Sequence, residues 1–167
     1  IYDWFDNNEQ AIQEYGHISN WNTKNITNMM ELFLIKETFN EDISRWNTSN
    51  VTTMKGMFNG CKAFNHPLND WDVSKVKNMR AMFFECEQFN QPLNKWMVSN
   101  VKDMCYMFNR CYTFKQDISN LKINDNTATV GYIFSQYPPP HWLEVEPFHQ
   151  SGLDKSKQPM YPLKLGY

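Results

Sequence analysis

The sequence predicts an α/β solenoid of four 25-residue coils, each with short parallel strands and a short helix. The first observation is a column of tryptophans spaced 25 residues apart, namely Trp21, Trp46, Trp71 and Trp96. The second is that further apolar columns keep this spacing without an insertion or deletion: Phe33, Phe58, Phe83, Phe108; Phe39, Phe64, Phe89, Phe114; Met29, Met54, Met79, Met104; Met57, Met82, Met107; and Cys61, Cys86, Cys111. A period of about 20–50 residues is typical of repeat proteins whose units bury their apolar faces only against neighbouring units.

A short helix is expected in each coil. The column of Asn28, Thr53, Asn78 and Asp103 contains good helix N-cap residues. The M-x-x-M-F pattern that follows places apolar residues at i, i+3 and i+4, which is the inward stripe of a helix. The helices are therefore predicted over 29–35, 54–60, 79–85 and 104–110.

Extended segments are expected between these helices. Pro67 and Pro92 stand at the start of the segment that ends at a tryptophan, a place where a strand tolerates a missing N–H. Parallel coils stack about 4.8 Å apart, so the tryptophan, phenylalanine and methionine columns become internal ladders. We therefore interpret these columns as structural and not as binding residues.

The cysteine column is interpreted as buried thiols, because cysteine packs as a small apolar side chain. A disulfide between adjacent coils is the alternative, although it needs specific Cβ geometry and leaves one member over. The sequence has no C-x-x-C and no histidine at ligand spacing, so no metal and no cofactor is predicted.

The chain divides into four parts. Residues 1–20 form an N-terminal helical cap, in which Asn7 caps a helix over Asn8–Tyr15 and Gly16 ends it. Residues 21–120 are the four-repeat solenoid, and 121–136 are a degenerate fifth repeat that closes it. Residues 137–167 hold six of the eight prolines and are expected to be an extended tail. Whether the tail packs on the chain itself or on a partner is left open.

Composition and motifs narrow the function. Sixteen basic and eighteen acidic side chains give a net charge of −2, which argues against nucleic acid or anionic lipid as a partner. No apolar run approaches the roughly 18 residues of a membrane span. The four histidines are scattered, and neither a nucleophile at a recognisable spacing nor a glycine-rich phosphate loop is present. These observations do not favour an enzyme or a small-molecule ligand.

Exposed columns supply the candidate partner-binding residues. One is Glu41, His66, Gln91 and Gln116, and beside it is the row Arg45, Asp70 and Lys95, whose charges alternate in sign. The tail contributes aromatic candidates at Tyr137, Trp142, Phe148 and Tyr161. Alternating charge is the pattern expected of direct neighbours on adjacent coils. Two pairs of like charges, Lys55/Arg80 and Lys77/Lys102, form a small basic strip that would suit an acidic partner.

With the repeat established, the chain resembles the BspA-like leucine-rich-repeat surface proteins, in the 25-residue form seen in Mycoplasma-type lipoproteins. Residues 64–74 through Cys86 match that repeat almost throughout, and 11–21 are similar to the entry segment of members from algae and large DNA viruses. The resemblance covers about 8–120. It implies a leucine-rich-repeat-like solenoid used for surface display, adhesion or assembly, without catalytic residues. The departures are Lys36 for Cys, Met97 for Asp, Lys115 for Asn and Leu121 for Trp.

The resulting prediction is a non-enzymatic interaction or structural subunit of a larger assembly, with the solenoid as docking surface and the tail as anchor. The alternative is a surface-exposed adhesion or recognition module, and an enzyme is the remote alternative. The expected partners are other proteins, in a virus particle, an organellar complex or at a cell surface. The chain begins at Ile1, so a targeting segment upstream of it would not be visible and the compartment stays open.

Overall fold

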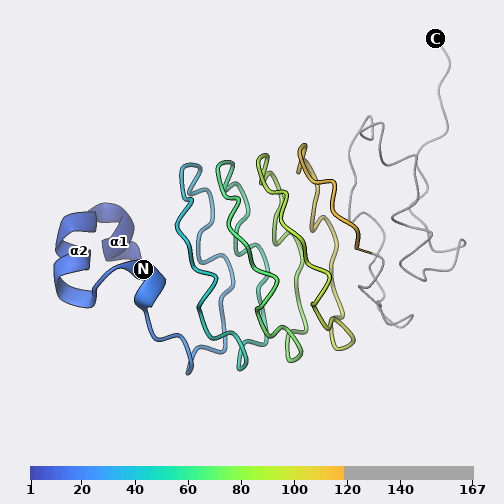
Figure 1. Cartoon of the computed structure of the whole chain (residues 1–167), viewed down its shortest axis with the longest axis horizontal. Coiled ribbons are helices and arrows are strands. Elements are labelled where there is room, and N and C mark those ends of the chain that lie inside the picture. Colours follow the sequence, from blue (N-terminus) through green and yellow to red (C-terminus); the bar gives the residue numbers. More distant parts are fainter. Residues whose placement is uncertain (119–167) are drawn as a thin grey trace, which may run out of the picture.

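The computed structural model describes residues 1–118 (Figure 1). The predicted fifth repeat over 121–136 and the predicted tail over 137–167 lie outside the described residues, as do the last two residues of the predicted solenoid.

The chain starts with a helical hairpin. Helix α1 (Tyr2–Asp6) is followed by α2 (Asn8–Tyr15) and by a 3-10 turn, η1 (Ile18–Asn20). The side chain of Asn7 accepts a hydrogen bond from the backbone N–H of Gln10, which satisfies one of the free N–H groups at the start of α2. Gly16 ends the helix with a positive φ of 74°. The observed helix α2 has the bounds that the sequence predicts.

After η1 the chain winds through four successive coils that lie side by side (Figure 1). We number them coil 1 (21–45), coil 2 (46–70), coil 3 (71–95) and coil 4 (96–118). Parallel bridges join Asn28 to Thr53, Thr53 to Asn78, and Asn78 to Asp103. Residues that are 25 apart in sequence are therefore neighbours on adjacent coils.

The short helices predicted in each coil are wrong: the structure has turns there. Alternate backbone N–H groups of this segment donate to carbonyls of the next coil, as from Met29 to Thr53 at 3.0 Å and from Phe33 to Met57 at 2.9 Å. Others close tight turns onto a carbonyl three residues back, as from Leu34 to Glu31 at 3.1 Å, and within the described coils none makes the bond to the carbonyl four residues back that an α-helix needs. Glu31 and Ile35 have φ values of 55° and 57°, which a right-handed helix cannot contain. We call this segment the arc (residues 28–35, 53–60, 78–85 and 103–110).

The predicted short parallel strands are reduced to single bridges within residues 21–118. Tight turns interrupt the extended segments every few residues. For example, Trp46 N–H bonds the carbonyl of Ile43 at 3.0 Å where coil 1 passes into coil 2, and Val51 N–H bonds that of Thr48 at 2.9 Å. A chain that bends this often cannot present a longer run of backbone N–H and C=O groups to the neighbouring coil, so no longer strand forms.

The core is a set of stacked aromatic rings. Phe58 stacks on Phe33 and Phe83 of the adjacent coils, with ring centroids 5.4 and 5.5 Å apart, and on Phe64 of its own coil at 4.2 Å. The columns that sequence analysis interprets as ladders are buried, apart from the half-buried Trp21: Trp46, Trp71, Trp96; Phe39, Phe64, Phe89, Phe114; Met29, Met54, Met79, Met104; and Cys61, Cys86, Cys111. Trp21 belongs to the end coil and meets the edge of Trp4 from α1 at 5.9 Å.

All three column cysteines are free thiols. Each Sγ donates to a phenylalanine carbonyl of the preceding coil, from Cys61 at 3.0 Å, Cys86 at 2.9 Å and Cys111 at 2.8 Å. Burial raises the pKa of the Cys61 thiol to about 12. A high pKa keeps the thiol protonated and unreactive, so these residues serve packing and coil-to-coil bonding.

Candidate interaction surfaces

The candidate residues Glu41, His66, Gln91 and Gln116, which we call the polar row, lie at equivalent positions of successive coils. Three of them bond the preceding coil: Nε2 of His66 lies 2.9 Å from the carbonyl of Asn40, and Nε2 of Gln91 donates to the carbonyl of Asn65 at 2.9 Å. Gln116 does the same to Asn90 at 3.0 Å. Because a carbonyl only accepts hydrogen bonds, the proton of His66 is on Nε2. The polar row is thus held in place by bonds between coils.

An asparagine ladder runs beside the polar row. The Oδ1 atoms of Asn40, Asn65 and Asn90 accept hydrogen bonds from the backbone N–H groups of Asn65, Asn90 and Lys115, each at 2.9 Å. These residues are not among the candidates predicted from the sequence, although the F-N pair in coils 1, 2 and 3 is the signal that could have found them. Here a side-chain oxygen takes the place of a backbone carbonyl as the acceptor. The resulting hydrogen bonds join the coils at a position where no β-bridge forms.

The row of Arg45, Asp70 and Lys95, which we call the charged row, is exposed, and its side chains bond residues 25 positions away in sequence. Nζ of Lys95 lies 2.7 Å from Oδ1 of Asp70, and Arg45 donates to Oδ1 of Asn20 at 2.9 Å. Asp70 and Lys95 are 80% and 65% exposed at the side chain, so the pair contributes about 0–1 kcal/mol. The row therefore orients side chains on the surface more than it stabilises the fold.

The predicted basic strip is partly neutralised. Lys55 lies 3.8 Å from Glu31 of the preceding coil, and Arg80 lies 3.7 Å from Asp103 of the following coil. An acidic partner would have to compete with these carboxylates. Within the described chain, the strip is weaker as a docking surface than the like charges in sequence suggest.

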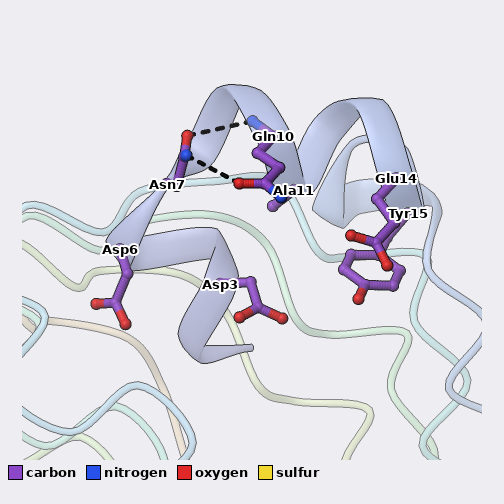
Figure 2. A pocket seen from close by; sticks show the side chains of 7 residues that line it. All are labelled: Asp3, Asp6, Asn7, Gln10, Ala11, Glu14 and Tyr15. Atoms are coloured by element: carbon purple, nitrogen blue, oxygen red, sulfur yellow. Dashed lines mark hydrogen bonds between the residues drawn. The ribbon is translucent and has the colours of Figure 1, made fainter.

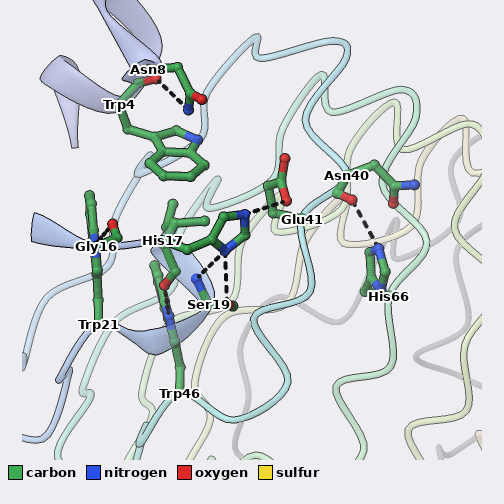
Figure 3. A network of polar contacts seen from close by, with 11 residues as sticks. Trp4, Asn8, Gly16, His17, Ser19, Trp21, Asn40, Glu41, Trp46 and His66 are labelled. Atoms are coloured by element: carbon green, nitrogen blue, oxygen red, sulfur yellow. Dashed lines mark hydrogen bonds and ion pairs between the residues drawn. The ribbon is translucent and has the colours of Figure 1, made fainter. Parts of the chain in front are cut away.

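A small polar network joins the N-terminal hairpin to coil 1 (Figure 3). Nδ1 of His17 accepts from the backbone N–H of Ser19 at 3.3 Å and lies 2.8 Å from its Oγ, while Nε2 lies 3.4 Å from Oε2 of Glu41. The edge of the His17 ring meets the Trp4 ring, with centroids 5.1 Å apart.

This grouping of serine, histidine and glutamate has a structural explanation. One coil later, Oδ1 of Asp42 accepts from Ser44 N–H at 3.0 Å, as Nδ1 of His17 does from Ser19. The hydrogen bonds from Ser44 lower the pKa of Asp42. The two residues close the same turn in successive coils, so we interpret His17 as the cap of η1.

A concave feature lies on the hairpin itself (Figure 2). It is lined by Asp3, Asp6, Asn7, Gln10, Ala11, Glu14 and Tyr15. The hydrogen bond with Glu14 is the main cause that raises the pKa of Tyr15. Across residues 1–118, no group of three or more His, Cys, Asp or Glu side chains is arranged to hold a metal ion.

The aromatic candidates Tyr137, Trp142, Phe148 and Tyr161 lie outside the described residues. In the part of the chain that is described, no helix is long and apolar enough to cross a membrane.

Comparison with known proteins places these features in a family. The family described as "Mycoplasma protein of unknown function, DUF285" matches residues 1–130. No curated protein and no solved structure matches the chain. The family match spans the hairpin and all four coils, which make up most of the 167 residues. The chain therefore belongs to this Mycoplasma protein family of unknown function.

Proposed function

We propose that this protein is a non-enzymatic interaction or structural subunit of a larger protein assembly. In this proposal the coil stack is an α/β solenoid of the leucine-rich-repeat-like class and its outer columns are the docking surface. Residues 137–167, which lie outside the described residues, are proposed as an anchoring arm.

The observation that carries the proposal is that side chains of the polar row and the charged row are bonded between coils. Gln91 and Gln116 are bonded to backbone carbonyls of the preceding coil, and Lys95 is bonded to Asp70. Side chains that are already ordered lose little conformational entropy when a partner binds. Repeating the same position on adjacent coils gives an extended, pre-organised surface, which is how repeat proteins recognise partners.

The placement of the reactive side chains also supports an interaction role. The column thiols are buried and bonded to carbonyls. His17 closes a turn, and His66 bonds the carbonyl of Asn40. Groups that a catalytic mechanism would need to be free are thus used to hold coils together.

A photo-cross-linking residue in place of Asp70, introduced into the full chain in its native source, tests the proposal. Asp70 is exposed in the charged row, and its replacement affects one surface ion pair. Lys75 is exposed in another column and also makes one surface bond to the preceding coil, to Asn50, so it serves as the matched control position. We expect one discrete cross-linked partner from position 70 and none from position 75.

The proposal is wrong if both positions give only uncross-linked chain that migrates as a free monomer in gentle extracts. Labelling of intact source cells with a membrane-impermeant amine reagent separates the two versions of the function. Modification of the chain's lysines on intact cells would favour the adhesion or recognition module over an internal assembly subunit.

A further inference from the structure

Four peptide groups in each arc, at alternate positions, point the same way along the stack. In four columns, the N–H of one coil donates to the carbonyl of the next at 2.7–3.0 Å, through all three coil junctions. Every second donor has a left-handed φ, between 52° and 77°. An ordinary β-edge presents N–H and C=O groups on the same side in alternation, whereas this alternation of conformations turns the N–H groups toward coil 4 and the carbonyls toward the hairpin.

Coil 1 is the end of this array. The carbonyls of Asn28, Met30, Leu32 and Leu34 hold the positions at which Thr53, Lys55, Met57 and Asn59 accept hydrogen bonds from the preceding coil. Coil 1 has no preceding coil, and among residues 1–118 no donor bonds these four carbonyls. We call this row the carbonyl edge.

The hairpin covers the carbonyl edge only in part: Asn28 and Met30 are exposed, while Leu32 and Leu34 are half-buried. Met30 and Ile35 are 45% and 67% exposed, whereas the equivalent Lys55 is half-buried and Gly60 is buried. The residue types differ as well. Coils 2 and 3 have Lys55 and Arg80 where coil 1 has Met30, and coil 4 has a charged residue at the position of Ile35. Coil 1 therefore presents apolar side chains beside unpaired acceptors.

The electrostatics of this end are negative. Residues 1–37 carry six acidic and two basic side chains, whereas 38–118 carry eight acidic and ten basic ones. The four carboxylates of the first 20 residues are all exposed. Aligned peptide dipoles add partial negative charge at their carbonyl ends, as they do at the C-terminus of a helix. Phe5 of α1 packs on Phe33 with ring centroids 6.2 Å apart, which holds the acidic hairpin against coil 1.

Only some partners fit an edge made of acceptors alone. A regular β-strand presents carbonyls as well as N–H groups, so half of its edge would oppose like groups. The guanidinium of arginine and the ammonium of lysine are donors without acceptors. Their aliphatic stems can cover apolar side chains while the charged head reaches an acceptor, as Met30 and Ile35 would require. Lys36 shows that an ammonium fits this region, because its Nζ lies 4.4 Å from the centroid of the Phe5 ring.

We propose that the carbonyl edge of coil 1, together with the acidic hairpin, docks an arginine- or lysine-rich segment of a partner protein. Two coil 1 edges placed face to face would oppose carbonyl to carbonyl, so this edge does not suit a symmetric pair of chains, and a head-to-tail copy is an outcome of the test. This surface lies at the end of the stack and is separate from the polar row. It is also separate from the basic strip, which would suit an acidic partner and not a basic one.

The test uses the full chain and a fluorescein-labelled octa-arginine peptide, with binding followed by fluorescence anisotropy. The variant Met30→Lys/Ile35→Arg places two cations at the edge and copies residue types that other coils carry at those positions. The control Met97→Lys/Tyr112→Lys adds the same charge at exposed positions of coil 4. We expect the edge variant to weaken the Kd at least about tenfold, since charge-assisted hydrogen bonds are lost, and the control to change it less than about twofold. Unfolding midpoints in urea show that both variants fold.

Each other outcome overturns the proposal. Equal weakening in the two double variants would mean general attraction to net charge and no site at coil 1. Equal binding of octa-citrulline, which has a similar shape to octa-arginine but carries no charge, would mean that the edge does not recognise a cation. Concentration-dependent association of the chain alone, abolished by Met30→Lys/Ile35→Arg, would assign the edge to a head-to-tail second copy. None of these outcomes alters the cross-linking expected at Asp70, so the two proposals fail separately.

Discussion

The indole Nε1 of Trp46 donates a hydrogen bond to the carbonyl of Ile18 at 2.9 Å, across 28 positions in sequence. The same carbonyl accepts the backbone N–H of Trp21 at 3.2 Å. Trp71 and Trp96 repeat the contact on the following coils. Each of these tryptophans therefore contributes a buried ring to the core and a hydrogen bond to the backbone carbonyl 28 residues before it.

This double role predicts a position-dependent cost of losing the indole nitrogen. Trp96→Phe removes a buried hydrogen bond to Leu68 and leaves unfilled volume, so we expect the free energy of unfolding to fall by about 1–3 kcal/mol. Trp21→Phe is the matched control, because its Nε1 bonds the carbonyl of Gly16 in an exposed place and should cost less than about 1 kcal/mol. Urea unfolding of both variants measures the difference. Equal losses would mean that ring volume alone matters.

The two glycines of the coil 2 arc should differ in their tolerance of a side chain. Both have left-handed φ values, 58° for Gly56 and 77° for Gly60. A Cβ at Gly60 would lie 3.2 Å from the backbone Cα of Ile35, whereas one at Gly56 would meet side-chain Cγ of Glu31 at 3.1 Å. We expect Gly56→Ala to cost about 1 kcal/mol from the backbone conformation. Gly60→Ala should cost at least about 2 kcal/mol, because backbone cannot move aside as a side chain can.

Thermal or urea unfolding of the two alanine variants checks this order. A larger loss of stability for Gly56→Ala would contradict this order. It would show that the backbone at Ile35 makes room for a methyl group more easily than the side chain of Glu31 does.

The asparagine ladder predicts that the oxygen of the amide is the part that matters. Oδ1 of Asn65 accepts from the backbone N–H of Asn90 at 2.9 Å and from Nε2 of Gln91 at 3.1 Å. Asn65→Ala removes both bonds and should lower the free energy of unfolding by about 1–2 kcal/mol. Asn65→Asp retains an acceptor of the same shape and should stay near the wild-type value at pH 7. An aspartate variant as unstable as the alanine variant would contradict this role.

The buried thiols predict a loss of stability at alkaline pH. Burial raises the pKa of Cys61 from 9.0 to about 12, so above about pH 9 the unfolded chain binds fewer protons than the folded chain. The free energy of unfolding therefore falls between about pH 9 and 12, by up to about 1.4 kcal/mol per pH unit for this thiol. Below pH 9 the contribution is constant.

Urea unfolding at pH 7 and pH 10, carried out with wild type and with Cys61→Ala, measures that slope. The alanine variant should decline less steeply with pH, because it lacks one group whose proton affinity differs between the two states. Identical slopes would mean that the Cys61 thiol ionises in the folded protein as it does in the unfolded one.

The arc shows where a local sequence pattern was insufficient. Apolar residues at i, i+3 and i+4 in Met54, Met57 and Phe58 suit a helix, and Thr53 suits its N-cap. The same spacing also suits a turn whose N–H groups bond the next coil, and left-handed φ values occur even at Ile35 and Glu85. Whether N–H groups bond locally or to a neighbouring coil depends on what lies 25 residues away, which a helical pattern does not report.

The polar row shows a different limit. Gln91 and Gln116 were candidates because they recur on a predicted outer face, and the structure shows that each also bonds the preceding coil. Binding to a partner and bonding to a neighbouring coil both produce a recurring polar residue, so periodicity alone does not distinguish the two uses. The carbonyl edge has no sequence signal except the apolar Met30 and Ile35, at positions where two of the other three coils have a charged residue.

By itself the sequence determined the 25-residue period, the hairpin helix Asn8–Tyr15 and the residue types that alternate along each coil, because these follow from spacing and local capping. Only the tertiary structure decided that the arc is a turn, that the column thiols are free and bonded to carbonyls, and that coil 1 ends in a row of carbonyls that no donor among residues 1–118 bonds. The physical reason is that backbone groups carry no residue identity. Their direction is set by hydrogen bonds between coils that are 25 residues apart.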